Sequence, residues 1–392
     1  MSNYSFDEVI DRKNTNSLKY DFAVERGKPA EVLPLWVADM DFKTAPGVTS
    51  ALVEAATHGI FGYTEAKENY AAAVINWYKK RFGITYKGEW LVKTPGIVFA
   101  LALAVKAYTN SGDGVLIQTP VYYPFYEVIR DNNRRIIENP LINDNNKFSV
   151  DFEDFEEKIK REKVKLFILC SPHNPVGRVW TKDELEKVVS ICKKHNVIIV
   201  SDEIHCDFVY EGYTHTPTLE VAGDYSENVI ICTSPGKTFN IAGIQDSNIF
   251  IPGKELRQKF QQELNASGYS QLNTFAIKAC IAAYETGEEW LDELKKYLKG
   301  NLDFVKEFIA TRLPKVKLTE PEGTYLIWLD FSEYGLSKEE LNDLVINKAG
   351  LWLDAGHIFG EAYEQYQRIV IAAPRTTISE AFEKLAQALS NL

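Results

Sequence analysis

Residues 231–243 read ICTSPGKTFNIAG, an apolar, β-rich segment that runs into a loop of small residues containing Lys237. A loop of this kind can display an amine at the end of a buried strand. Such a lysine can form a Schiff base with an aldehyde, and it becomes nucleophilic when burial or a neighbouring charge destabilises its ammonium form. Most lysines that follow a strand are solvated loop residues, so the interpretation depends on the strands that precede this one.

An earlier run, residues 197–205, reads VIIVSDEIH and contains Asp202 near its end. Its β-branched residues are typical of a strand buried on both faces. Asp202 would then lie at the carboxyl end of the strand, the edge where open α/β sheets bind ligands. A carboxylate there can keep a pyridine nitrogen protonated, which makes the ring an electron sink. Capping of the next turn, or pairing with a lysine, would explain the same residue.

Two further apolar strands end in side chains suited to hold a flat ring. Residues 165–170, KLFILC, run into the turn SPHNPVG, which holds Asn174 rigidly. The Asn174 amide can donate a hydrogen bond to a phenolate oxygen, although an Asn-Pro turn needs no such role. Residues 114–120, GVLIQTP, precede Tyr122, whose ring can lie against a cofactor or pack in the core.

The four strand ends supply an aromatic ring, an amide, a carboxylate and a lysine, in that order along the chain. With these residues the chain resembles the fold-type I pyridoxal-phosphate enzymes of the class I/II aminotransferase group, from about Trp36 to Arg375. The resemblance implies pyridoxal 5′-phosphate as cofactor, a homodimer as the assembly and a mostly parallel sheet of the seven-stranded type.

The resemblance also assigns a role to each candidate residue. Lys237 would carry the cofactor as an internal aldimine and then act as the catalytic base. Tyr122 would stack on the ring, and a nearby tyrosine or Lys237 could protonate the departing group. Asp202 would pair with the pyridine nitrogen, with His205 beside it, and Asn174 would bind the ring oxygen at the substrate site.

The cofactor phosphate would lie near Ser234 and near Gly96, Ile97 and Val98. A Pro-Gly turn opens a predicted helix at this second segment, and the free N–H groups and dipole of a helix start favour an anion. Tyr63 matches a tyrosine that reaches the phosphate and substrate of the neighbouring subunit. The resemblance therefore makes the site a property of the dimer.

Residues 368–375, RIVIAAPR, read as a buried strand that ends in Arg375. Arg375 matches the clamp that holds the carboxylate of an amino-acid substrate. A planar guanidinium suits this task because it can make two parallel hydrogen bonds to one carboxylate. A surface salt bridge is the alternative role.

Departures from the aminotransferase pattern indicate the subfamily. Gly236 stands where a serine is usual, Gln245 replaces the arginine that anchors the phosphate, and His205 replaces a tyrosine. Together with LWVADMDF at 35–42 and DAGHIFG at 354–360, these residues resemble the MalY/PatB type of cystathionine β-lyase.

That resemblance implies elimination across a carbon–sulfur bond of a sulfur amino acid. Cystathionine would yield homocysteine, pyruvate and ammonia, and cysteine would yield hydrogen sulfide. An aminotransferase is the alternative, since it shares the first steps and then reprotonates the cofactor. A cofactor-binding regulatory protein is a third possibility, although the chain shows no helix-turn-helix extension or basic patch.

The composition agrees with a soluble enzyme. A net charge of −11 disfavours nonspecific binding to nucleic acid. We expect cytoplasmic residence, because no signal segment or membrane-spanning apolar run is evident. The five cysteines have no metal-type spacing and the six histidines are scattered, so we expect reduced core cysteines and no metal.

At 392 residues the chain exceeds the size of a single hydrophobic core, so two domains are expected. Strands alternate with helical stretches such as 181–196, which predicts an α/β fold whose mostly parallel sheet is covered by helices. We assign 48–287 to this large cofactor-binding domain. Residues 1–47 and 288–392 would form a smaller α/β domain from both chain ends.

Overall fold

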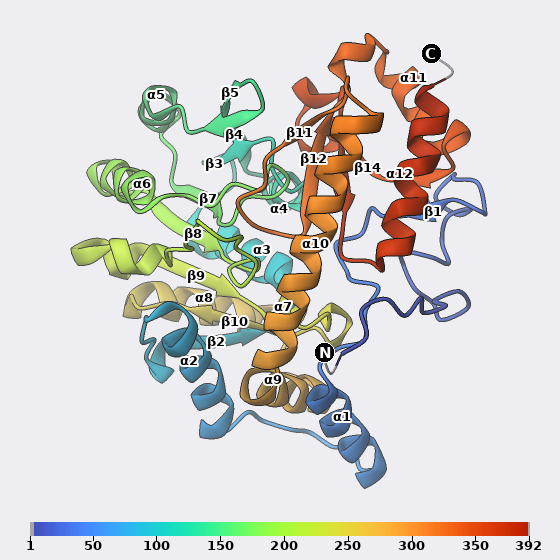
Figure 1. Ribbon diagram of the computed structural model, residues 1–392. Helices are drawn as coiled ribbons and strands as arrows, with labels where there is room; N and C mark the ends of the chain where they lie inside the picture. Colours follow the sequence, from blue (N-terminus) through green and yellow to red (C-terminus); the bar gives the residue numbers. More distant parts are fainter. Residues whose placement is uncertain (1–3, 391–392) are drawn as a thin grey trace.

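The computed structural model describes residues 4–390, and two separate sheets organise them (Figure 1). The large sheet has seven strands in the order β2-β10-β9-β8-β7-β3-β4. Strand β10 is antiparallel to both neighbours, and the other pairs are parallel. The strands are β2 (Leu91–Thr94), β3 (Gly114–Thr119), β4 (Arg135–Pro140), β7 (Leu166–Cys170), β8 (Ile198–Asp202), β9 (Val229–Thr233) and β10 (Ser247–Phe250). The predicted α/β class with a mostly parallel sheet is confirmed.

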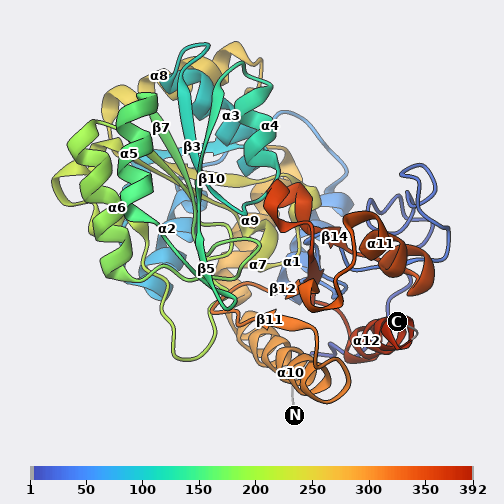
Figure 2. The same cartoon turned by 90° about the horizontal axis from the view of Figure 1, so that it is seen from above.

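The central strands are apolar throughout because both faces of this sheet are covered. Along β7, Leu166 and Ile168 pack into one core cluster while Phe167 and Leu169 pack into another. Helices α3, α4 and α8 cover the first face, and α5 and α6 lie on the second (Figure 2). These helices are α3 (Ile97–Tyr108), α4 (Pro124–Arg130), α5 (Phe152–Glu162), α6 (Lys182–His195) and α8 (Lys254–Ala266).

The second sheet is antiparallel and comes from the C-terminal part of the chain, in the order β11-β12-β15-β14. Its strands are β11 (Lys317–Thr319), β12 (Leu326–Asp330), β14 (Asp354–Ala355) and β15 (Tyr366–Val370). Helices α10 (Glu288–Arg312), α11 (Lys338–Asp343) and α12 (Arg375–Leu389) belong to the same part. The short β1 (Leu33–Pro34) pairs with β13 (Leu351–Trp352), so the N-terminal segment lies against this region.

This arrangement agrees with a smaller unit built from both chain ends, while boundaries at 48 and 288 remain a prediction. Further helices at α1 (Pro46–His58), α2 (Glu68–Phe82) and α9 (Thr274–Thr286) pack together. Among residues 4–390, no helix combines the length and apolar character needed to cross a membrane.

Candidate functional site

A cavity of about 160 Å³ lies at the carboxyl ends of the parallel strands. It collects nearly all the residues predicted from the sequence, namely Lys237, Asp202, Asn174, Tyr122, His205, Ser234, Gly96, Ile97 and Val98. These residues follow β2, β3, β7, β8 and β9, whose ends meet at this edge. Arg375 and Tyr63 are not among the lining residues.

Lys237 lies in a single helical turn, α7 (Pro235–Thr238), directly after β9. Ser234 caps this turn by accepting a hydrogen bond from the Gly236 N–H at 2.9 Å. A Cβ atom at Gly236 would lie 3.0 Å from Ser234 Oγ and 3.3 Å from Ala242 Cα, so the close turn favours glycine. The local sequence therefore fixes the lysine backbone tightly.

The Lys237 amine donates a hydrogen bond to the Ala38 carbonyl at 2.6 Å. Burial lowers its pKa to about 8, against the opposing effect of the Asp39 carboxylate. About a tenth of the amine is therefore neutral at pH 7, far more than for an ordinary lysine, and the neutral form is the one that a general base or nucleophile requires.

Asp202 is buried and accepts a hydrogen bond from the Ile204 N–H at 3.1 Å. Burial raises its pKa to about 7. Burial also lowers the pKa of His205 to about 3, so its imidazole is neutral. His205 Nδ1 is buried without a hydrogen-bond partner among the described residues. A protonated ring nitrogen placed near Asp202 would offset the cost of its buried charge.

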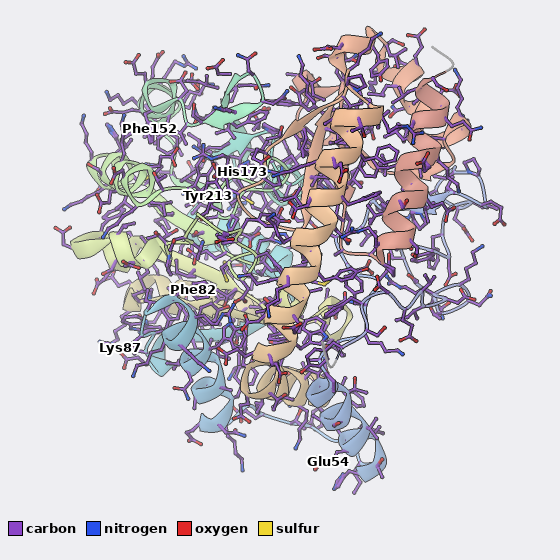
Figure 3. All side chains as sticks on the ribbon, in the orientation of Figure 1. Glu54, Phe82, Lys87, Phe152, His173 and Tyr213 are labelled. Carbon is purple, nitrogen blue, oxygen red and sulfur yellow. The ribbon has the colours of Figure 1, made fainter. Side chains whose placement is uncertain are left out.

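Asn174 is oriented by its Oδ1, which accepts a hydrogen bond from Arg368 Nη1 at 3.0 Å. The Nδ2 group of this amide is thereby left as the donor. The turn itself is fastened by the interior His173 (Figure 3), whose Nε2–H donates to the Pro120 carbonyl at 2.8 Å. Asn174 thus presents a fixed donor at the cavity.

The start of α3 forms the other end of the cavity. Gly96 precedes it with φ of 155°, in the region that favours glycine. The first N–H groups of a helix have no partner within the helix, so those of Ile97 and Val98 can bind an anion. Gln245 also lines the cavity, at the place where the family pattern has an arginine.

The structure places Arg375 outside the cavity lining and at the start of a helix, not at the end of a strand as predicted. Strand β15 ends at Val370, and Arg375 begins α12. Its Nε donates to Asn301 Oδ1 at 2.7 Å, and its guanidinium lies 5.2 Å from the centroid of the Phe304 ring. The predicted strand was extended too far, because an apolar segment continues from 371 to 374 after the strand has ended.

Arg368 lies beside the site instead, and the sequence prediction missed it. It is 2% exposed, forms an ion pair with Asp354 and donates to the Trp36 carbonyl at 2.8 Å. Arg368 does not itself line the cavity, but its bond to Asn174 places it directly behind a residue that does. The available signal was a charged residue within an otherwise buried strand, which is rarely tolerated without a partner or a function.

The Ala38 carbonyl, which accepts the hydrogen bond from Lys237, belongs to an irregular segment, residues 35–42. This segment is hydrogen-bonded both to the small sheet and to the loop that carries Lys237. Asp41 N–H donates to the Ala372 carbonyl at 2.9 Å, on the side of the small sheet. Asn240 accepts from the Met40 N–H at 2.9 Å, on the side of the lysine loop. The position of Ala38 therefore depends on its contacts with the small sheet and with the loop that carries Lys237.

Four charges hold this segment, two of them buried (Lys19 and Asp41) and two partly buried (Arg12 and Asp39), and no sequence pattern indicated them. Arg12 donates to Asp39 Oδ2 at 2.7 Å and to Asp41 Oδ1 at 2.6 Å. Lys19 is completely buried and donates to Asp41 Oδ2 at 2.8 Å. Burial alone would raise the pKa of Asp39, but the Arg12 hydrogen bond and the Lys19 charge lower it. Asp39 is therefore ionised beside the Ala38 carbonyl.

Tyr63 is fully exposed and lies away from the cavity of its own chain. Ile60 and Phe61 beside it are also exposed, at 71% and 60%. Its contribution to a neighbouring subunit stays a prediction. Among residues 4–390 no cluster of three or more His, Cys, Asp or Glu side chains is arranged to hold a metal ion.

Comparison with known proteins gives consistent results over the whole chain. The family model for class I and II aminotransferases matches residues 30–385. The chain is 42% identical to cystathionine β-lyase PatB of Bacillus subtilis, covering 98% of this chain and 100% of that protein. It is 31% identical to MalY of Escherichia coli, covering 98% and 99%. Cystalysin of Treponema denticola, whose structure contains pyridoxal 5′-phosphate, superposes with a TM-score of 0.96 at 38% identity, over 99% of both chains.

Proposed function

The chain belongs to the class I and II aminotransferase family, and from this premise we propose that it is a pyridoxal-phosphate-dependent cystathionine β-lyase. Cystathionine and one molecule of water would yield homocysteine, pyruvate and ammonia. The observation that carries the proposal is one cavity holding the Lys237 amine, the Asp202 carboxylate and the Asn174 amide, in a chain 42% identical to PatB. The family resemblance expected from the sequence is thereby confirmed.

The residues of the cavity fit pyridoxal phosphate. Lys237 would hold its aldehyde, Asp202 its ring nitrogen and Asn174 its phenolic oxygen. Ser234 and the start of α3 would bind the phosphate in the absence of the usual arginine. When bound, this cofactor supplies an electrophilic carbon for amines and a ring that accepts electrons.

Proton transfer is the task of Lys237. Its neutral amine would remove the proton from the α-carbon of the substrate, and the electron pair would be stabilised through the ring that Asp202 keeps cationic. The bond between the β-carbon and sulfur then breaks, and the departing thiolate takes a proton. Burial raises the pKa of Tyr122, so its hydroxyl keeps its proton and can serve as a donor together with Lys237.

Arg368 is the residue that we assign to the substrate carboxylate. Its Nε is buried and has no hydrogen-bond partner among the described residues. Its contact with Asn174 lies beside the predicted position of the cofactor ring. A planar guanidinium fixed in this way can bind a carboxylate with defined geometry.

A homodimer and cytoplasmic residence belong to the same proposal. The exposed apolar side chains around Tyr63 support a partner surface. All five cysteines are free and buried, which is consistent with a reducing compartment.

The test is to incubate the purified, cofactor-loaded protein with cystathionine in the absence of a keto acid. We expect pyruvate and free thiol in equal amounts. Failure to form pyruvate, combined with amino transfer once a keto acid is added, would assign the protein to the aminotransferases.

A further inference from the structure

A second and larger cavity, of about 980 Å³, lies next to the catalytic one. We call it the distal cavity. Strand β4 and helix α4 contribute to it from the large sheet, and α11 and the N-terminal segment contribute from the other side. None of the catalytic steps derived above uses it.

Only one layer of side chains separates the two cavities. Tyr122 lines the catalytic cavity and Tyr123 lines the distal one, with ring centroids 5.3 Å apart. Asp354 also lines the distal cavity, and its carboxylate pairs with Arg368, which bonds Asn174 in the catalytic cavity. Because Arg368 contacts both Asn174 and Asp354, a substrate carboxylate bound at Arg368 would lie at the boundary between the two cavities.

The distal cavity has a basic wall. Arg26, Lys28 and Lys338 line it, and none of them forms an ion pair with another described residue. Arg26 lies over the ring of Trp36 at 5.4 Å, and Trp36 stacks on Trp352 with centroids 4.3 Å apart. Three unpaired cations and an aromatic floor thus face the same space.

Acidic residues line the cavity from both sides. Glu127 on α4 and Glu138 on β4 come from the large sheet and Glu361 from the C-terminal part, none with an ion pair to a described residue, while Arg130 on α4 also lines the cavity and pairs with Asp131. Partial burial raises the pKa of Glu138. The two sets of charges line one cavity without meeting, so a ligand that carries both an ammonium and a carboxylate group can engage both.

On the basis of the proposed lyase activity, we propose that the distal cavity binds the leaving half of the substrate and selects thiols that end in a zwitterionic amino-acid group. Cystathionine has such a group, whereas the leaving group of cysteine is a bare sulfur that would leave this cavity empty. Charges outside the catalytic cavity would then select the substrate.

The experiment compares kcat/KM for cystathionine and S-methylcysteine in the cofactor-loaded protein. Lys28→Met/Lys338→Met removes two charges of the basic wall while keeping the side-chain length. We expect kcat/KM for cystathionine to fall about three- to tenfold, since partly exposed charges contribute modestly. The value for S-methylcysteine should stay within about twofold, because its leaving group has no charge to recognise.

Lys87→Met/Lys254→Met is the matched control, since both lysines are exposed, lie outside the distal cavity and have no ion pair among the described residues. Figure 3 labels Lys87 on the surface.

A third substrate, S-(2-carboxyethyl)cysteine, has a terminal carboxylate and no distal amine. Glu127→Gln/Glu138→Gln should therefore weaken the use of cystathionine and leave this third substrate unchanged.

An equal loss with cystathionine and S-methylcysteine, or no loss with either, would overturn the distal-cavity proposal while leaving the lyase activity in place. If the unaltered protein releases pyruvate from neither substrate, the lyase proposal fails, and the distal-cavity proposal fails with it.

Discussion

The charge of Asp202 destabilises the cofactor-free protein, whereas in the cofactor-loaded protein it would pair with the ring nitrogen of the cofactor. The Asp202 pKa of about 7 in the folded protein exceeds the ordinary value of 3.8. Between about pH 4 and pH 7 the folded state therefore holds a proton that the unfolded state has lost, so the free energy of unfolding falls as the pH rises through this range. Asp202→Asn should therefore stabilise the cofactor-free protein at pH 8 by up to about 4 kcal/mol, with a smaller gain at pH 5. Denaturant unfolding at both values checks this, and an equal or opposite effect would contradict the assigned burial cost.

The same substitution should lower kcat by about a hundredfold or more in the loaded protein, because the ring nitrogen loses its charged partner. Activity and stability of the Asp202→Asn variant would then change in opposite directions. A variant that is both less stable and less active would indicate a structural role for the carboxylate.

Arg368 and Arg375 give a second prediction at the scale of single residues. Arg368→Lys should raise KM for cystathionine about tenfold or more, because an ammonium cannot replace the planar pair of donors. Arg375→Lys is the matched control and should leave KM within about twofold, since this arginine lies against Phe304 and Asn301. Steady-state kinetics of the two variants measure these KM values. A raised KM for Arg375→Lys and an unchanged KM for Arg368→Lys would make Arg375 the residue that binds the substrate carboxylate.

At the scale of elements, the buried charges that hold residues 35–42 give the next prediction. Lys19→Met should lower the free energy of unfolding by about 3–5 kcal/mol, because Asp41 loses a completely buried partner. Lys43→Met breaks an exposed pair with Glu8 near the same segment and should cost less than about 1 kcal/mol. Urea unfolding of both variants measures the difference, and similar losses would show that the buried network contributes no more than a surface pair.

The elements also show what could be predicted from the sequence. The strands that lead to Asn174, Asp202 and Lys237 were predictable because each is a continuous apolar run ended by turn residues. The network around Asp39 was not predictable, because its partners come from an irregular segment about 20 to 30 residues away and follow no period. The strand end predicted at Arg375 was wrong for a similar reason, since an apolar pattern does not mark where a buried strand ends.

At the scale of the whole molecule, the assembly of two subunits determines whether the Lys237 site is complete. In the proposed dimer, Tyr63 of each subunit serves the Lys237 site of the other. Tyr63→Ala and Lys237→Ala proteins should each be inactive or nearly so as homodimers. When the two are unfolded together and refolded, half of the dimers should be mixed, and each mixed dimer has one intact site out of two, so about a quarter of the unaltered activity should return.

This complementation distinguishes the two possible positions of Tyr63. If Tyr63 acted within its own chain, every site in the mixture would lack either the tyrosine or the lysine, and no activity would return. Tyr63 is fully exposed in the isolated chain and absent from the lining of its own cavity, which favours the shared site. Recovery should also require exchange of subunits, so mixing the two folded proteins without unfolding should restore activity slowly or not at all.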